Sequence, residues 1–256
     1  MENDTDRPSY EPELTEPPRT EAPTTQLNSV QRLWMVFTSP GKVFEAIGVK
    51  PTWVVCLVLM VALGLVAQFV MLPHVDNEAT IRARLEARGT EVSEAQIETM
   101  LEQGEKFAKF APIIGIVVGP IFWAILAAIF FVILKIVGSE ADYVKALSTA
   151  LHAYWPASVV QTILMSMLIQ RMGKMPQDEL ANVVKAHLGV FLSADAPAWL
   201  TAVAGSISVF NIWIVVLLIM GFATVGKISR GKAAVVALVP WVVYLIGKAG
   251  IAAVFY

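Results

Sequence analysis

Long apolar runs with almost no charged residue alternate with short polar stretches along this chain, and this pattern limits the fold more than any other feature. A run of about 18 or more apolar residues is long enough to cross a bilayer as a helix. The 256 residues are 56% hydrophobic and only 16% charged, whereas soluble domains carry about 25% charged residues. We therefore predict an all-α polytopic membrane bundle with five transmembrane helices and short interfacial helices. The expected spans are residues 52–72, 112–134, 146–168, 206–225 and 233–256.

Charge and cysteine content exclude several classes of function. The net charge of −2 gives no reason to expect a nucleic-acid partner. The single cysteine, Cys56, lies in the first apolar run and excludes an internal disulfide and a cysteine-based zinc site. None of the three histidines belongs to an HExxH pair. We therefore expect no metal, no cofactor and no catalytic residues.

Residues 1–29 are acidic and rich in proline, with seven Asp or Glu, two Arg and five Pro. Such a segment cannot bury enough apolar surface to order itself. It also lacks the basic start and apolar core of a signal peptide. We expect a disordered cytoplasmic tail that solubilises the chain, and a docking tail for a basic partner is the alternative.

A short helix precedes the first span, at residues 38–48. Ser39 can cap it, Pro40 suits its first position, and Gly48 can end it. Its apolar face is expected to lie in the inner-leaflet interface or against the bundle. We assign the candidate membrane-interface or partner surface to five apolar residues on and before this helix: Trp34, Phe37, Val43, Phe44 and Ile47.

Two polar stretches between spans also predict helices. Residues 76–109 read as two helices broken at residues 88–90, and Ser93 with Gln96 forms a capping box for the second. An interfacial helix is expected at about residues 176–191. Residues 226–232 hold three basic residues and no acid, which places that loop and the N-terminus in the cytoplasm and the C-terminus outside. The 76–109 loop, expected outside, has five basic residues among eight acids.

Polar side chains inside the spans are costly, so they are the candidate functional residues of the membrane region. They are His152, Gln161, Asn211 and Lys248. They could form a polar pathway or a lipid-headgroup site, or they could hydrogen-bond between helices while Lys248 extends outward. Gly115 and Gly119 permit close helix packing, within the bundle or at a seam between two copies of the chain.

Several stretches, taken in order, resemble the bacterial branch of the Yip1-domain family over residues 30–256. They are Phe37 to Ile47, Ala146 to Pro156, Phe210 to Trp213, and Lys227 to Ala233. The resemblance implies five spans and a cytoplasmic N-terminus, but it supplies no catalytic residues. Eukaryotic members associate with Rab GTPases in vesicle traffic, and a bacterial member would have no such partner. Asn211 departs from the acidic residue expected there in many members.

These observations favour a non-enzymatic protein of the bacterial inner membrane that acts as a scaffold or adaptor. It would contact the lipid bilayer and recruit protein partners at its cytoplasmic N-terminal region. The alternative is a translocator of lipids or small solutes that uses polar groups of the third to fifth spans. A membrane enzyme is the least supported of the three classes.

Overall fold

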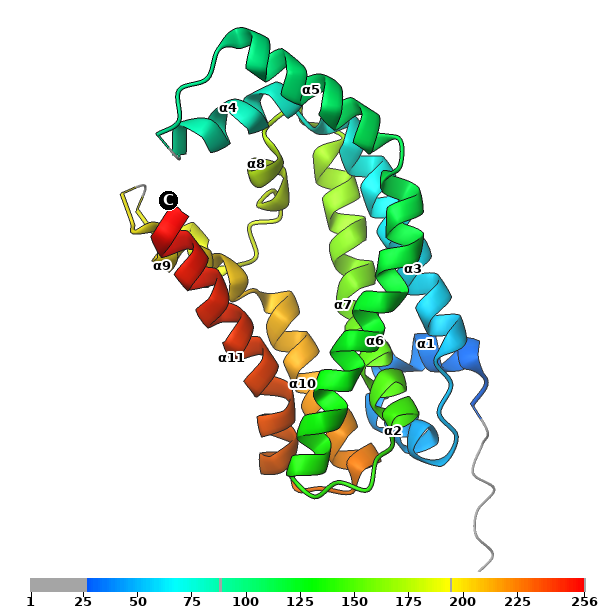
Figure 1. The fold of residues 1–256 in the computed structure, drawn as a ribbon. Coiled ribbons are helices and arrows are strands. Elements are labelled where there is room, and N and C mark those ends of the chain that lie inside the picture. Colours follow the sequence, from blue (N-terminus) through cyan, green and yellow to red (C-terminus); the bar gives the residue numbers. More distant parts are fainter. Residues whose placement is uncertain (1–26, 88, 194, 256) are drawn as a thin grey trace, which may run out of the picture.

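A computed structural model of the chain describes residues 27–255 except 88 and 194, and the predicted disordered tail lies almost entirely outside them. The described part is a bundle of helices (Figure 1). In chain order the elements are α1 Ser29–Thr38, α2 Pro40–Val49, α3 Val54–Met71, η1 Leu72–His74, α4 Asn77–Ala87, α5 Glu94–Ala108, α6 Ala111–Ile136, α7 Tyr143–Ile169, α8 Gln177–Ala181, η2 Leu188–Phe191, α9 Ala198–Ser206, α10 Val209–Gly226 and α11 Arg230–Phe255.

The all-α membrane bundle predicted from the apolar runs is confirmed. Four of the described helices are long and apolar enough to cross a membrane, namely α3 with its η1 extension, α6, α10 and α11. The remaining expected span, the third along the chain, is α7, which has 27 residues and so measures about 40 Å. It is more polar than the other four, so the count of five spans stays a prediction.

Helix α7 is central to the bundle, which explains how a more polar helix fits among apolar ones. It contacts α1, α2, α3, α6 and α10. Small residues recur along its buried face and let these neighbours approach closely: Ala146, Ala150, Ala153 and Ala157. Most of the first half of α7 therefore faces protein rather than lipid.

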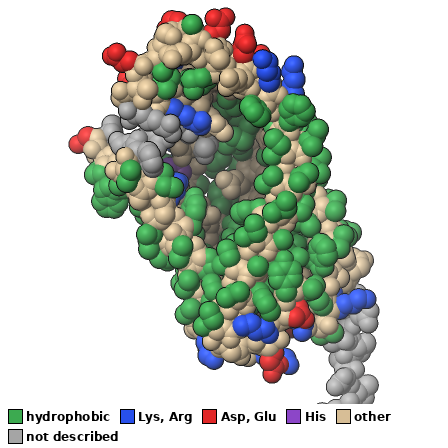
Figure 2. All heavy atoms as spheres, in the orientation of Figure 1, with side chains coloured by type: hydrophobic (Ala, Val, Ile, Leu, Met, Phe, Trp, Pro, Cys, Tyr) green, Lys and Arg blue, Asp and Glu red, His purple; other side chains and the backbone are tan. Residues whose placement is uncertain are grey.

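The two ends of the bundle differ in composition. Helix α2 and the α6–α7 and α10–α11 connections lie at one end, whereas α4, α5, α8 and the C-terminus lie at the other (Figure 1). Basic side chains outnumber acidic ones at the first end, whereas acidic side chains, with some basic ones beside them, lie over α4 and α5 (Figure 2). The described segments predicted to be cytoplasmic thus share one end, and the described segments predicted to be external share the other.

The α4–α5 hairpin matches its prediction. The turn contains Gly89 at a φ of 61°, a left-handed conformation that glycine adopts without strain. Ser93 and Gln96 form the expected capping box at the start of α5. Arg82 joins the two helices because its guanidinium binds Glu78 of α4 and Glu94 of α5, at 2.9 and 2.7 Å.

The interfacial helix expected at residues 176–191 is wrong as a single helix. The segment forms only the five-residue α8 and, after a turn, the 3₁₀ turn η2. Its backbone bonds instead to distant segments: Leu188 N–H donates to the carbonyl of Ile207 and Val209 N–H donates to that of Ala186, both at 3.0 Å. These long-range bonds replace the intrahelical ones, so the apolar periodicity of the segment does not become a helix.

Candidate functional site

The predicted helix before the first span exists as α2, but both predicted end signals differ. Ser39 precedes Pro40, yet its side chain makes no capping hydrogen bond. Gly48 does not end the helix, which continues to Val49. A Cβ on Gly48 would lie 4.0 Å from the Cα of Val225, so this glycine lies where α2 meets α10.

The apolar face of α2 packs inside the bundle. Val43, Phe44 and Ile47 are 0% exposed. The ring of Phe44 lies against α10, because a Cβ on Gly221 would come within 2.9 Å of it. These three residues therefore pack against the bundle, the second of the two placements expected for this face, and their assignment to a membrane-interface or partner surface is wrong. The spacing of these apolar residues at i, i+1 and i+4 reflects a helix face that is buried in the protein.

The other two residues of that predicted surface lie on α1 and remain accessible. Trp34 is 74% exposed, although Leu33 and Val36 of the same helix are buried. Phe37 is half-buried and its ring meets the ring of Trp213 edge to face, at 6.2 Å between centroids. The ring of Trp34 lies 6.3 Å from that of Phe37. Trp34 thus extends outward from a helix whose opposite face is packed.

Arg32 holds α1 in place. The residue is 3% exposed. Its Nη1 donates to the carbonyl of Lys50 at 2.7 Å and to Oγ1 of Thr52 at 3.0 Å, and its Nε donates to the carbonyl of Leu27 at 3.1 Å. Lys50 follows the last residue of α2, where a cation is favourable. Burial lowers the pKa of Arg32 from its ordinary value.

The structure does not bring the four intramembrane polar candidates together. His152 is buried, and its Nδ1 lies 2.8 Å from the carbonyl of Ser148 one turn earlier in α7. Gln161 is exposed on the second half of α7. Only Asn211 and Lys248 meet, and they do so through a residue that the sequence reasoning did not select, Ser206 at the end of α9.

The polar cluster consists of Ser206, Ser208, Asn211 and Lys248, and it joins α9, α10 and α11. Lys248 Nζ donates to Ser206 Oγ at 2.8 Å. Asn211 Nδ2 donates to the carbonyl of Ser206 at 2.6 Å, and the N–H of Asn211 donates to Oγ of Ser208 at 3.1 Å. The cluster therefore closes the break between α9 and α10, where backbone groups lack helical partners.

His187 lies beside this cluster because its backbone pairs with that of Ser208 in an isolated bridge. Both ring nitrogens of His187 are buried and make no hydrogen bond within the described residues. Its Nδ1 lies near two glycines, at 2.8 and 4.0 Å from where Cβ atoms on Gly189 and Gly205 would be. His187 lies in the segment predicted as the 176–191 helix, and that segment is not helical at this residue.

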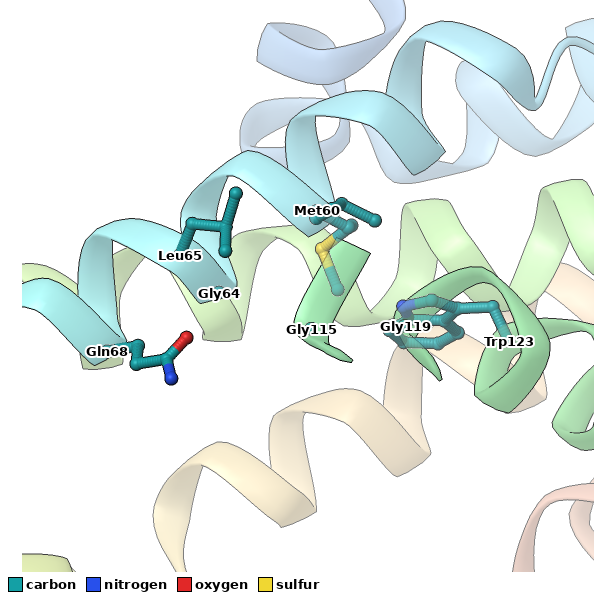
Figure 3. Close-up of a pocket in the computed structure, with 8 residues that line it drawn as sticks. Met60, Gly64, Leu65, Gln68, Gly115, Gly119 and Trp123 are labelled. Atoms are coloured by element: carbon teal, nitrogen blue, oxygen red, sulfur yellow. The ribbon is translucent and has the colours of Figure 1, made fainter. Parts of the chain in front are cut away.

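Gly115 and Gly119 of α6 face α3 within the bundle. Cβ atoms at these positions would lie 3.6 Å from Leu65 and 3.4 Å from Val61, which are ordinary contacts. Beside them is a pocket of about 260 Å³ whose lining includes Gln68 and Trp123 (Figure 3). The lining of this pocket is mostly apolar and includes one amide side chain, that of Gln68, so the pocket has few groups that could bind a polar ligand.

Among the described residues, no group of three or more His, Cys, Asp or Glu side chains could hold a metal ion. A family model described as the Yip1 domain matches residues 34–251, which is more than half of the chain. The chain belongs to the Yip1 domain family. Comparisons with curated proteins and with solved structures gave no match.

Two candidate regions, the exposed Trp34 and the polar cluster that contains Lys248, fall within the Yip1 domain. Trp34 is its first matched residue, and Lys248 lies three residues before its last. The Yip1 domain here is a multi-pass membrane domain that contacts the lipid bilayer through its apolar helices. The two regions lie on different helices, α1 and α11, and their chemistry differs: one is aromatic and the other is polar and cationic.

Proposed function

We propose that this protein is a non-enzymatic membrane scaffold or adaptor that recruits a protein partner through Trp34. The observation that carries the proposal is the 74% exposure of this large aromatic side chain on a helix that is otherwise fixed. Trp is among the side chains that contribute most to protein interfaces. The bilayer alone could also accept an interfacial Trp, so the experiment must separate lipid from protein.

The rigidity of α1 supports this role. Arg32 links α1 to the α2–α3 connection, and Leu33 and Val36 are buried against the bundle. A partner that binds Trp34 would therefore meet a preformed surface and would not have to order a mobile one, which lowers the entropic cost of binding.

We place the protein in the bacterial inner membrane, and the distribution of charge supports an orientation with the N-terminus in the cytoplasm and the C-terminus outside. Lys227 pairs with Glu140 at 3.4 Å, which joins the α10–α11 and α6–α7 connections at the end that also holds α2. Loops rich in Lys and Arg stay on the cytoplasmic side. Trp34 would then be available to cytoplasmic partners.

Photocrosslinking at position 34 in native membranes tests the proposal. A photoreactive phenylalanine analogue replaces Trp34 in one variant and Phe69 in the control, because Phe69 is 58% exposed on the apolar helix α3. A defined protein adduct at position 34, with only lipid adducts at position 69, is expected. Lipid adducts alone at both positions would reduce Trp34 to a bilayer anchor and refute the scaffold role at this face.

A deletion that tests the N-terminal segment must leave α1 and α2 intact. Deleting residues 1–48 would remove Phe44 and Ile47, which are 0% exposed, and would unfold the bundle. Deleting residues 1–26 leaves every described contact in place. If the adduct at position 34 survives this shorter deletion, α1 itself is sufficient for recruitment.

A translocator of lipids or small solutes is the second candidate. The polar cluster favours it, because Lys248 and Asn211 place polar groups within helices that are otherwise apolar. Figure 2 also shows a hollow in the molecular surface, with basic side chains and a histidine at its edge. Reconstituted vesicles that move labelled lipid or solute, and lose this activity with Asn211→Leu, would support transport over scaffolding.

A further inference from the structure

Lys248 is a cation in the last turns of the apolar helix α11, and it has no anionic partner among the described residues. Its neighbours on the surface of α11, Ile246 and Ile251, are 67% and 60% exposed, as expected for a lipid-facing helix. The Lys248 ammonium donates to Ser206 Oγ, and no carboxylate lies within 4.0 Å of it in the described part of the chain. A charged side chain within a membrane span is costly, so it usually pairs with an opposite charge.

Ser206 cannot supply the missing charge and has little capacity left for another group. Its hydroxyl donates to the carbonyl of Ala202 at 2.9 Å and accepts from Lys248. An ammonium has three N–H donors, of which this contact uses one. The contact directs Lys248 toward α9. The outward orientation that the sequence left open for this side chain is therefore not the one observed. Two donors of Lys248 therefore remain for a ligand.

His187 adds a second unsatisfied group next to the same helix end. Its backbone pairs with Ser208, and its ring approaches Gly205, the neighbour of Ser206. A buried imidazole with no hydrogen bond loses the energy of hydration without compensation. A ligand oxygen that accepts from the ring N–H would provide the missing partner.

The cluster lies near residues that suit the boundary between acyl chains and headgroups. Trp199 at the start of α9 is 47% exposed, and Phe191 at the end of η2 is 84% exposed. Helix α9 contacts both η2 and α11. Exposed aromatic side chains are enriched at this boundary. The apolar surroundings favour an anion that arrives within the lipid over one dissolved in water.

We propose that Lys248 and His187 bind the phosphate of an anionic phospholipid at the α9–α11 end of the bundle. The phosphate supplies the negative charge that Lys248 lacks and oxygen acceptors for both side chains. The net negative charge of the lipid matters, because a choline headgroup would offset the phosphate. Binding requires neither transport of the lipid nor the recruitment proposed for Trp34, so each proposal can fail alone.

Lipid retention measured by native mass spectrometry tests this site. The full chain is reconstituted in nanodiscs of phosphatidylcholine, alone or mixed with phosphatidylglycerol, and then released in detergent. The wild type is expected to retain phosphatidylglycerol over phosphatidylcholine, and Lys248→Gln to reduce this preference about tenfold, the size expected for one charge-assisted hydrogen bond. Lys109→Gln is the matched control, because Lys109 is an exposed lysine at the α5–α6 junction.

Further variants separate binding from folding and lipid from soluble phosphate. Lys248→Arg should keep most of the preference, whereas His187→Phe should weaken it while retaining an aromatic ring. If Lys248→Gln fails to fold, these two variants decide the question. Unchanged lipid retention in Lys248→Gln and His187→Phe would overturn the site. Displacement of the lipid by equimolar inorganic phosphate would show a site for soluble anions and would overturn the lipid assignment.

Discussion

Replacing Gly221 by alanine should destabilise the bundle, because three helices meet at this glycine. A Cβ there would lie 2.5 Å from Cγ2 of Thr149 on α7 and 2.9 Å from the ring of Phe44 on α2. Both neighbours are 0% exposed, so neither can move into empty space. The clash is therefore with packed side chains on two sides.

The magnitude follows from two opposing effects. Inserting a methyl group into a packed core costs about 1–3 kcal/mol. Alanine gains about 0.5–1 kcal/mol over glycine within a helix. The expected net loss in the free energy of unfolding is at most about 2.5 kcal/mol, with a central value of about 1 kcal/mol. For a chain of this size each kcal/mol lowers the melting temperature by about 2–4 °C.

The single cysteine of the chain provides the assay. Cys56 is 2% exposed in α3, so a dye that fluoresces on reaction with thiols reports unfolding during a thermal ramp. Gly64→Ala is the matched control, because a Cβ on Gly64 of α3 meets nothing within 4 Å. It should be neutral or slightly stabilising.

A second substitution tests whether the clash is the cause. Thr149→Ser removes the Cγ2 atom that the new methyl group would meet, so it should restore part of the stability that Gly221→Ala loses. Coupling of about 0.5–2 kcal/mol between the two sites is expected, as for residues in contact. Gly221→Ala as stable as Gly64→Ala, or a double variant no better than additive, would refute the described packing of α2, α7 and α10.

Three further changes test other contacts. Arg32→Met should lower the melting temperature measured with Cys56, because it leaves the carbonyl of Lys50 without its donor. Ser139→Ala should loosen the basic end and speed hydrogen exchange there, since the Ser139 hydroxyl donates to the carbonyl of Gly226 at 3.0 Å. Arg82 lowers the pKa of Glu94, so the contact between them stabilises the α4–α5 hairpin above the ordinary glutamate pKa and is lost as the pH falls through the lowered value. Hydrogen exchange of α5, corrected for the intrinsic pH dependence of amide exchange, should therefore quicken as the pH falls below the ordinary glutamate pKa, and Glu94→Gln should remove this effect.

The sequence predicted the elements whose signals are local. Apolar runs gave α6 within two residues of its observed bounds, and the capping box gave the start of α5. The part of the predicted 176–191 helix that follows residue 181 was mispredicted, because the backbone of Ala186 and Leu188 bonds to that of Val209 and Ile207. The cluster at Lys248 was predicted only in part, since the bond to Ser206 spans 42 positions in the sequence. Neither long-range contact leaves a periodic signal.

The misassigned face of α2 shows why an apolar stripe alone does not identify a binding surface. Val43, Phe44 and Ile47 would show the same spacing if they faced lipid, a partner or the core. The difference lies in α10, where Gly221 lacks the side chain that would otherwise keep Phe44 away. Trp34 shows the complementary case: its own helix has a packed face, and Trp34 lies outside it. Exposure relative to the neighbouring helices, rather than hydrophobicity, therefore separates the residues that build this bundle from those free to bind.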